Sequence, residues 1–193
     1  MNVDPILSSI SQYVRLSPTE IDLFTAVLEP RSVAKKDYLI RTGELCRYDH
    51  FVNKGCLKVC YANQKGVECV TKFAIENWWV VDIESFLQET PSFFYYQAVE
   101  ETELLQISKA NYQMLTQKIP AFQQFLTDRW QHGFIQLQHR FIQNSSLTAE
   151  EKYAQYLRKY PGLDQRISLK LTASYLGITP EFLSVLRKRA ASS

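Results

Sequence analysis

The sequence predicts an α+β protein in which an antiparallel β-domain is followed by a long helix and a compact helical domain. Three observations support this prediction. Between residues 29 and 108, short strand-like runs alternate apolar and polar residues and are separated by turn residues. From residue 119 to 141, apolar residues recur at steps of three or four, as on one face of a helix. The last 26 residues contain two short helical patterns joined by a glycine.

The composition is that of a globular protein with a substantial core. The chain has 193 residues, of which 46% are hydrophobic, so it can form one large domain or two small ones. We expect no membrane association, because no run of 18 apolar residues occurs. The N-terminal residues lack the pattern of a signal peptide, so we expect a cytoplasmic protein.

The charges are divided unevenly along the chain. Residues 1–145 contain 14 Lys and Arg against 16 Asp and Glu, a net charge of −2, whereas residues 146–193 contain 8 against 4, a net charge of +4. A compact basic segment suggests a polyanionic partner, although a solvated basic surface would look the same.

The N-terminal part begins with helices and continues as strands. Residues 5–28 are predicted to be helical, with a start at Ser17-Pro18-Thr19-Glu20, where serine caps and proline occupies the first turn. The strand pattern from residue 29 to 108 favours a small antiparallel barrel or sandwich. The four cysteines form no CxxC pair and are expected to be buried hydrophobes, with an iron–sulfur or redox role as the alternative.

A long helix is predicted between the two domains. Its apolar stripe is expected to pair with a second copy of the chain, and Gly133 would allow a close crossing. The alternative is that the stripe packs on its own β-domain. The break at 144–146 predicts a hinge, so the domains are placed at 1–116, 117–145 and 146–193. The residues assigned to the dimer contact are Phe122, Leu126, Trp130 and Leu137.

The C-terminal residues predict a helix-turn-helix. One helix runs from Ser168 to a terminating Gly177, and Thr179-Pro180-Glu181 then starts a second. In this motif the second helix enters the major groove of DNA, and its first turns face the base edges. An ordinary helical hairpin is the alternative. The residues assigned to DNA binding are Thr179, Glu181, Ser184, Val185 and Lys188.

The chain also resembles a known family, on motifs in both domains. In the β-domain these are Arg41-Thr42-Gly43-Glu44, Val52–Val59 and Gly66-Val67-Glu68, and in the C-terminal domain Ala173–Ser184. With them the chain resembles the cyclic-AMP receptor/FNR family of bacterial regulators, and most of all those of Bacteroidetes. The resemblance implies a cyclic nucleotide-binding-type barrel (a jelly roll) as a sensor, a dimerising central helix and a two-fold symmetric DNA site. It also implies RNA polymerase as a partner.

Three departures from the family pattern bear on function. Asp82 takes the place of the glutamate that holds the ligand ribose, and no arginine follows to hold the cyclic phosphate. Residues 73–108 contain no Lys or Arg and seven acids, so we expect no useful affinity for cyclic AMP. Val185 stands where many members place a base-reading arginine, and the sequence leaves no length for a β-hairpin wing.

The sensor pocket is therefore expected either to be filled by side chains or to hold an apolar small molecule. The pocket residues proposed on this basis are Trp79, Asp82, Phe93 and Tyr95. Neither a cofactor nor a metal is expected, since only His50 of the three histidines lies in the β-domain.

The sequence thus favours a homodimeric DNA-binding transcription factor. A sensor that has lost specific DNA binding and acts through protein contacts is the alternative. An enzyme such as a cupin would need several histidine ligands, and no catalytic residues are identified.

Overall fold

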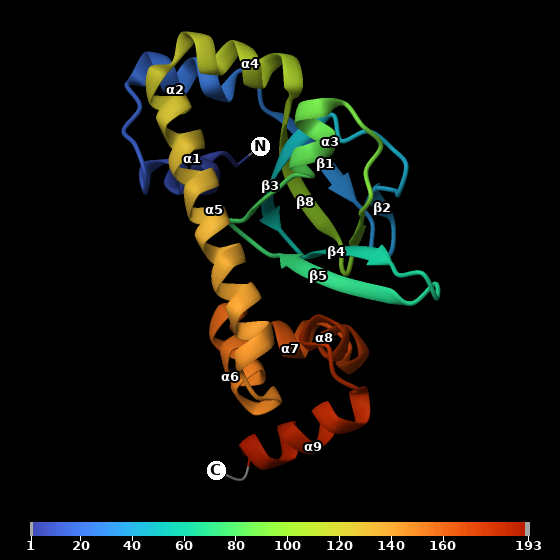
Figure 1. Cartoon of the computed structure of the whole chain (residues 1–193). Coiled ribbons are helices and arrows are strands. Elements are labelled where there is room, and N and C mark those ends of the chain that lie inside the picture. The colour runs from blue at the N-terminus through green and yellow to red at the C-terminus, as the bar shows by residue number, and fades with distance from the viewer. Residues whose placement is uncertain (1, 192–193) are drawn as a thin grey trace. The chain divides into compact units, whose positions relative to one another are not determined.

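A computed structural model describes residues 2–191, with the side chains of residues 190 and 191 left undescribed. The chain forms two compact units (Figure 1). The first contains the N-terminal residues through Tyr61 together with Lys72–His132. The second contains Ala62–Thr71 and the residues from Gly133 onward. The boundary falls inside the long helix, so each unit is described separately.

The strands form two four-stranded antiparallel sheets. One has the order β1-β8-β3-β6 and the other the order β2-β7-β4-β5. Among the described residues neither sheet closes on the other, so the predicted barrel is wrong in this respect and the domain is a jelly-roll sandwich. The eight strands are β1 (Glu29–Val33), β2 (Tyr38–Ile40), β3 (Tyr48–Lys54), β4 (Leu57–Ala62), β5 (Glu68–Ala74), β6 (Trp79–Val80), β7 (Tyr95–Ala98) and β8 (Thr102–Ser108).

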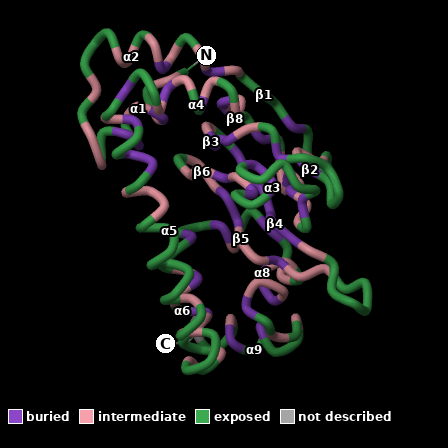
Figure 2. The backbone as a smooth tube through the Cα atoms, turned by 45° about the horizontal axis from the view of Figure 1, so that its top comes forward, coloured by how far each residue is buried: buried purple, intermediate pink, exposed green. Residues whose placement is uncertain are grey.

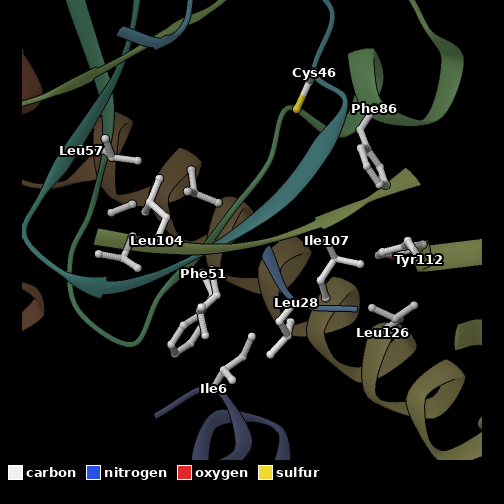
Figure 3. Close-up of a cluster of buried hydrophobic side chains, with 14 of the residues drawn as sticks. Ile6, Leu28, Cys46, Phe51, Leu57, Phe86, Leu104, Ile107, Tyr112 and Leu126 are labelled. Atoms are coloured by element: carbon white, nitrogen blue, oxygen red, sulfur yellow. The ribbon is translucent and has the colours of Figure 1, made fainter. Parts of the chain in front are cut away.

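Four helices of the first unit cover the sandwich on one side (Figure 1). They are α1 (Asp4–Ser11), α2 (Pro18–Thr25), α4 (Lys109–Lys118) and the first turns of α5 (Pro120–Ser146). Helix α2 begins as predicted, because the Ser17 hydroxyl accepts from the Glu20 amide and the Glu20 carboxylate accepts from the Ser17 amide. The shared core contains Ile6, Leu28, Phe51, Ile107 and Leu126 (Figure 3).

Helix α5 includes the predicted hinge residues 144–146 and ends at Ser146. The expected break at 144–146 is not observed, because two of the polar residues there bond within the helix. The Ser145 hydroxyl donates to the carbonyls of Phe141 and Ile142, and the Ser146 hydroxyl donates to that of Ile142. These bonds satisfy the two serine hydroxyls within the helix.

The second unit contains four further helices. They are α6 (Ala149–Lys159), α7 (Leu163–Arg166), α8 (Leu169–Leu176) and α9 (Pro180–Ala191). Helix α6 starts at a capping box formed by Thr148 and Glu151 and is capped at its end by Tyr160, before Pro161-Gly162. The core of the second unit is formed by apolar and tyrosine side chains, namely Tyr153, Tyr156, Tyr160, Leu163, Ile167, Ala173, Leu176, Leu183 and Leu186.

Candidate nucleic-acid interface

The turn between α8 and α9 has the local signals that the sequence predicted. Ser168 caps α8 by accepting from the Leu171 amide, at 3.4 Å. Gly177 ends α8 in the left-handed conformation, with φ of 70°. Glycine adopts this conformation without the steric cost that a Cβ atom brings. Thr179 then caps α9, because its hydroxyl accepts from the Phe182 amide at 3.2 Å.

Helix α9 has one buried side and one exposed side. Leu183 and Leu186 are buried against the rest of the second unit, at 0% and 3% exposure. Glu181, Val185 and Lys188 are exposed, and Ser184 is half-buried at the border between the two sides. The residues predicted to bind DNA therefore lie on one helix and its cap, and Glu181, Val185 and Lys188 among them are exposed.

Two cations of α9 are held by acids of the same unit. The Arg187 guanidinium lies 3.4 Å from the Asp164 carboxylate, and that of Arg189 lies 3.7 Å from Glu150. Both members of the second pair are largely exposed, so the pair contributes little and can exchange for another anion.

A cleft of about 430 Å³ lies in the second unit between the end of α5, α6 and α8. None of the described residues that line it is acidic. The Arg140 guanidinium lies 4.4 Å from the centre of the Tyr175 ring, and the Lys152 ammonium donates to the Asn144 carbonyl at 2.8 Å. This cleft adds positive potential to a unit that already has the more basic sequence. Its cations are Arg140, Lys152, Arg158 and Lys159.

The expected ligand site of the sensor contains a carboxylate bonded to a hydroxyl. Asp82 is buried, caps the short helix α3 (Ile83–Gln88) and accepts from the Ser85 amide. It also accepts from the Ser92 hydroxyl at 2.6 Å. The oxygens of the Asp82 carboxylate are therefore already used as acceptors by groups of the protein itself.

Two of the other predicted pocket residues, Trp79 and Phe93, lie in different aromatic clusters. Trp79 packs on Phe51 and Phe125 and donates from its indole nitrogen to the Ser9 hydroxyl. Phe93 stacks near Tyr61 but is 60% exposed, so it does not fill an interior pocket. The aromatic residues therefore belong to separate clusters.

The same region contains a buried cation that the sequence reasoning missed. Lys58 of β4 is only 8% exposed, and its ammonium lies 5.8 Å from the centre of the Tyr95 ring. Lys58 lies outside the cation-free segment 73–108, but β4 pairs with β7 and brings Lys58 opposite Gln97. A lysine in the middle of an apolar strand was the available signal.

The predicted dimer stripe of α5 divides into two parts. Phe122 and Leu126 lie in the core of their own sensor, at 0% and 6% exposure, and Figure 3 shows Leu126 among core side chains. Trp130 is half-buried against the same core. Leu137 and Phe141 are 63% and 77% exposed, and this part of α5 is drawn as exposed in Figure 2. The first half of the stripe thus packs on the β-domain of its own chain, which was the alternative to pairing with a second copy.

A buried ion pair ties α5 to the sheet and was not predicted. The Arg129 guanidinium lies 2.5 Å from the Asp49 carboxylate of β3 and between the rings of Trp79 and Trp130. Burial raises the pKa of Asp49, and the charge of Arg129 opposes that rise. Close by in sequence, burial lowers the pKa of His50 to about 4.

Neither a cluster of metal ligands nor a membrane-spanning helix is found among the residues that the structure describes. Among the described residues, no group of three or more His, Cys, Asp and Glu side chains is placed to hold a metal ion. Within the same part of the chain, no helix is both long and apolar enough to cross a bilayer.

Comparison with known proteins agrees with this architecture. Residues 30–118 match the cyclic nucleotide-binding domain family. FixK2 from Bradyrhizobium japonicum has a similar fold, with a TM-score of 0.74 and 14% identity over 86% of this chain and 85% of FixK2. The c-di-GMP-responsive global regulator CLP from Xanthomonas campestris gives 0.71 and 15% over 91% and 92%. The catabolite activator protein of Thermus thermophilus gives 0.54 and 20% over 92% and 84%. No curated protein matches the sequence.

The fold is thus that of a β-domain joined through a long helix to a helical domain, and these three structures have a similar fold. Residues 30–118 are similar to the cyclic nucleotide-binding domain family, and the similarity of nearly the whole chain to these structures confirms the predicted resemblance to the cyclic-AMP receptor/FNR family in fold.

Proposed function

We propose that this protein is a homodimeric, DNA-binding transcriptional regulator of the cyclic-AMP receptor/FNR type. The observation that carries the proposal is the pair of helices α8 and α9. Their glycine turn and the exposed first turns of α9 match the arrangement in which a recognition helix enters the major groove.

The exposed side of α9 supplies two kinds of contact. Glu181 can accept from the amino group of cytosine, and Ser184 can donate to or accept from a base. Lys188 and the amides at the start of α9, which Thr179 caps, can hold phosphates. Phosphate contacts provide affinity, and the base contacts provide sequence preference.

A mobility-shift assay with genomic fragments tests this proposal. The full chain should retard a subset of fragments in the presence of excess non-specific DNA. Lys188→Glu should abolish the shift, because it places an anion against phosphates. Lys54→Glu is the matched control, because it makes the same charge change at the exposed end of β3 and should leave the shift intact. Retardation of no fragment would favour the alternative of a sensor that acts through protein contacts.

The proposed dimer uses the exposed half of α5. Phe134, Leu137 and Phe141 lie at spacings of three and four and are each more than half exposed. A second copy of the same helix would remove this apolar surface from water. Light scattering should report about twice 22.5 kDa at micromolar concentration, and the mass of one chain would contradict the dimer.

The regulator is further proposed not to respond to cyclic AMP. The Asp82 carboxylate accepts from the Ser92 hydroxyl, and the surrounding segment 73–108 has seven acids and no Lys or Arg. The nearby cation Lys58 belongs to β4, outside this segment, and its ammonium lies 5.8 Å from the centre of the Tyr95 ring. Calorimetry with cyclic AMP and cyclic GMP should show no binding at micromolar concentration, and a micromolar Kd for either would overturn the claim. We also propose that the regulator contacts RNA polymerase, which a pull-down tests. An apolar small molecule is proposed as the ligand of the β-domain, which ligand screening tests.

A further inference from the structure

The exposed side of α9 has an apolar centre. Val185 is 43% exposed and lies outside the buried core of the second unit. Among described residues, its helical neighbours at three and four positions are the exposed Glu181, Phe182, Lys188 and Arg189. The buried residues Leu183 and Leu186 lie on the other side of the helix. Val185 is therefore in the middle of the surface that α9 presents outward.

Valine at this position is also unfavourable for the helix itself. A β-branched side chain loses rotamer freedom in a helix, and an exposed position offers no packing in return. A local choice that opposes folding suggests a role in binding. Phe182 is similarly exposed, at 41%, but it lies one turn before Leu186 and so at the edge of the exposed side.

We infer that Val185 reads the C5-methyl group of thymine in the major groove. This inference rests on the proposed function, because it takes α9 to be the recognition helix. The side chain of valine can neither donate nor accept a hydrogen bond, so it cannot read guanine, adenine or cytosine by their polar edges. The thymine methyl is the apolar group that the major-groove edge of a natural base pair displays. Lys188 and Arg189 on the same side favour approach to the anionic groove.

The inference predicts the composition of the DNA site. Each half-site should contain a T·A pair opposite Val185, beside the pair addressed by Glu181. Discrimination at this position should come from apolar contact, so it should be modest. One buried methyl group corresponds to about fourfold in Kd.

Replacement of thymine by uracil tests the inference, because uracil keeps the pairing and removes only the methyl group. A random-sequence duplex library is first selected on the full-length protein. Each thymine of the selected duplex is then replaced by uracil, and binding is followed by fluorescence anisotropy. One thymine in each half-site should weaken binding about fourfold when it is replaced.

The Val185→Ala variant links that methyl group to the side chain. Alanine is a better helix former than valine, so this variant should fold. Its binding should be insensitive to uracil at the identified position. Phe182→Ala is the matched control, since it removes another exposed apolar side chain of the same helix and should keep the uracil effect.

The outcomes separate the two claims. Selection of a specific site at which no thymine is sensitive to uracil, or a full uracil effect in Val185→Ala, would overturn the inference and leave the proposed function standing. A library that yields no preferred sequence would overturn the proposed function and the inference with it.

Discussion

The two halves of α5 carry the same apolar stripe and are buried to very different extents. Phe122 and Leu126 are covered by the sensor of their own chain, whereas Leu137 and Phe141 are more than 60% exposed. The periodicity of the stripe is continuous along the helix. Hydrophobic periodicity therefore identifies an apolar face, and only tertiary structure shows what covers it.

The largest expected effect is on the buried half. Phe122→Ala should lower the free energy of unfolding of the sensor by about 3–5 kcal/mol, because it removes a fully buried ring and leaves a cavity. Denaturant unfolding followed by tryptophan fluorescence measures this. Phe141→Ala is the control with the same chemistry on the same stripe, and should change sensor unfolding by about 0.5 kcal/mol or less. Equal losses in the two variants would show that the halves do not differ.

The exposed half should instead control association. Leu137→Glu combined with Phe141→Glu should weaken the proposed dimer by more than about a hundredfold, because it places charges in an apolar contact. Light scattering over a dilution series gives the mass, and circular dichroism should show an unchanged fold. A double variant that stays dimeric would place the dimer contact elsewhere.

Lowering the pH should destabilise the buried core of the first unit through His50, by less than Phe122→Ala does. The pKa of His50 is lowered by burial to about 4, whereas in the unfolded chain it is close to 6.5. The unfolded state therefore binds more protons between these values, and stability is lost as the pH falls from 6.5 toward 4.

Between pH 7.5 and 5, His50 should account for a loss of about 2 kcal/mol. His50→Gln should remove that part of the pH dependence, measured by denaturant unfolding at both pH values. The raised pKa of Asp49 acts in the opposite direction, but it is present in both proteins and cancels in the comparison. An equal loss of stability in the wild-type protein and in His50→Gln would contradict a neutral, buried His50 imidazole.

Local signals were predicted well from the sequence, and distant pairings were not. The capping boxes at Ser17 and Thr148 and the glycine end of α8 depend on residues within three or four positions, so the sequence contains them. The Arg129–Asp49 pair joins residues 80 positions apart, and no local pattern indicates it. The position of Lys58 likewise depends on which strands pair.

The closed barrel failed as a prediction for a related reason. Strand spacing alone does not determine whether two sheets join at their edges, and among the described residues neither sheet pairs with the other. Two of the predicted sensor pocket residues come from separate segments of the chain and lie in different aromatic clusters, since Trp79 contacts Phe51 whereas Phe93 contacts Tyr61.

Binding to specific and scrambled duplexes at several salt concentrations tests the central claim most directly. The wild-type protein should prefer the selected duplex strongly, and Glu181→Ala should reduce this preference by about 1–3 kcal/mol per half-site. Lys188→Ala should weaken both duplexes alike and lower the salt slope by about one unit. A protein that binds both duplexes equally, or a Glu181→Ala variant with an unchanged preference, would contradict base reading by α9.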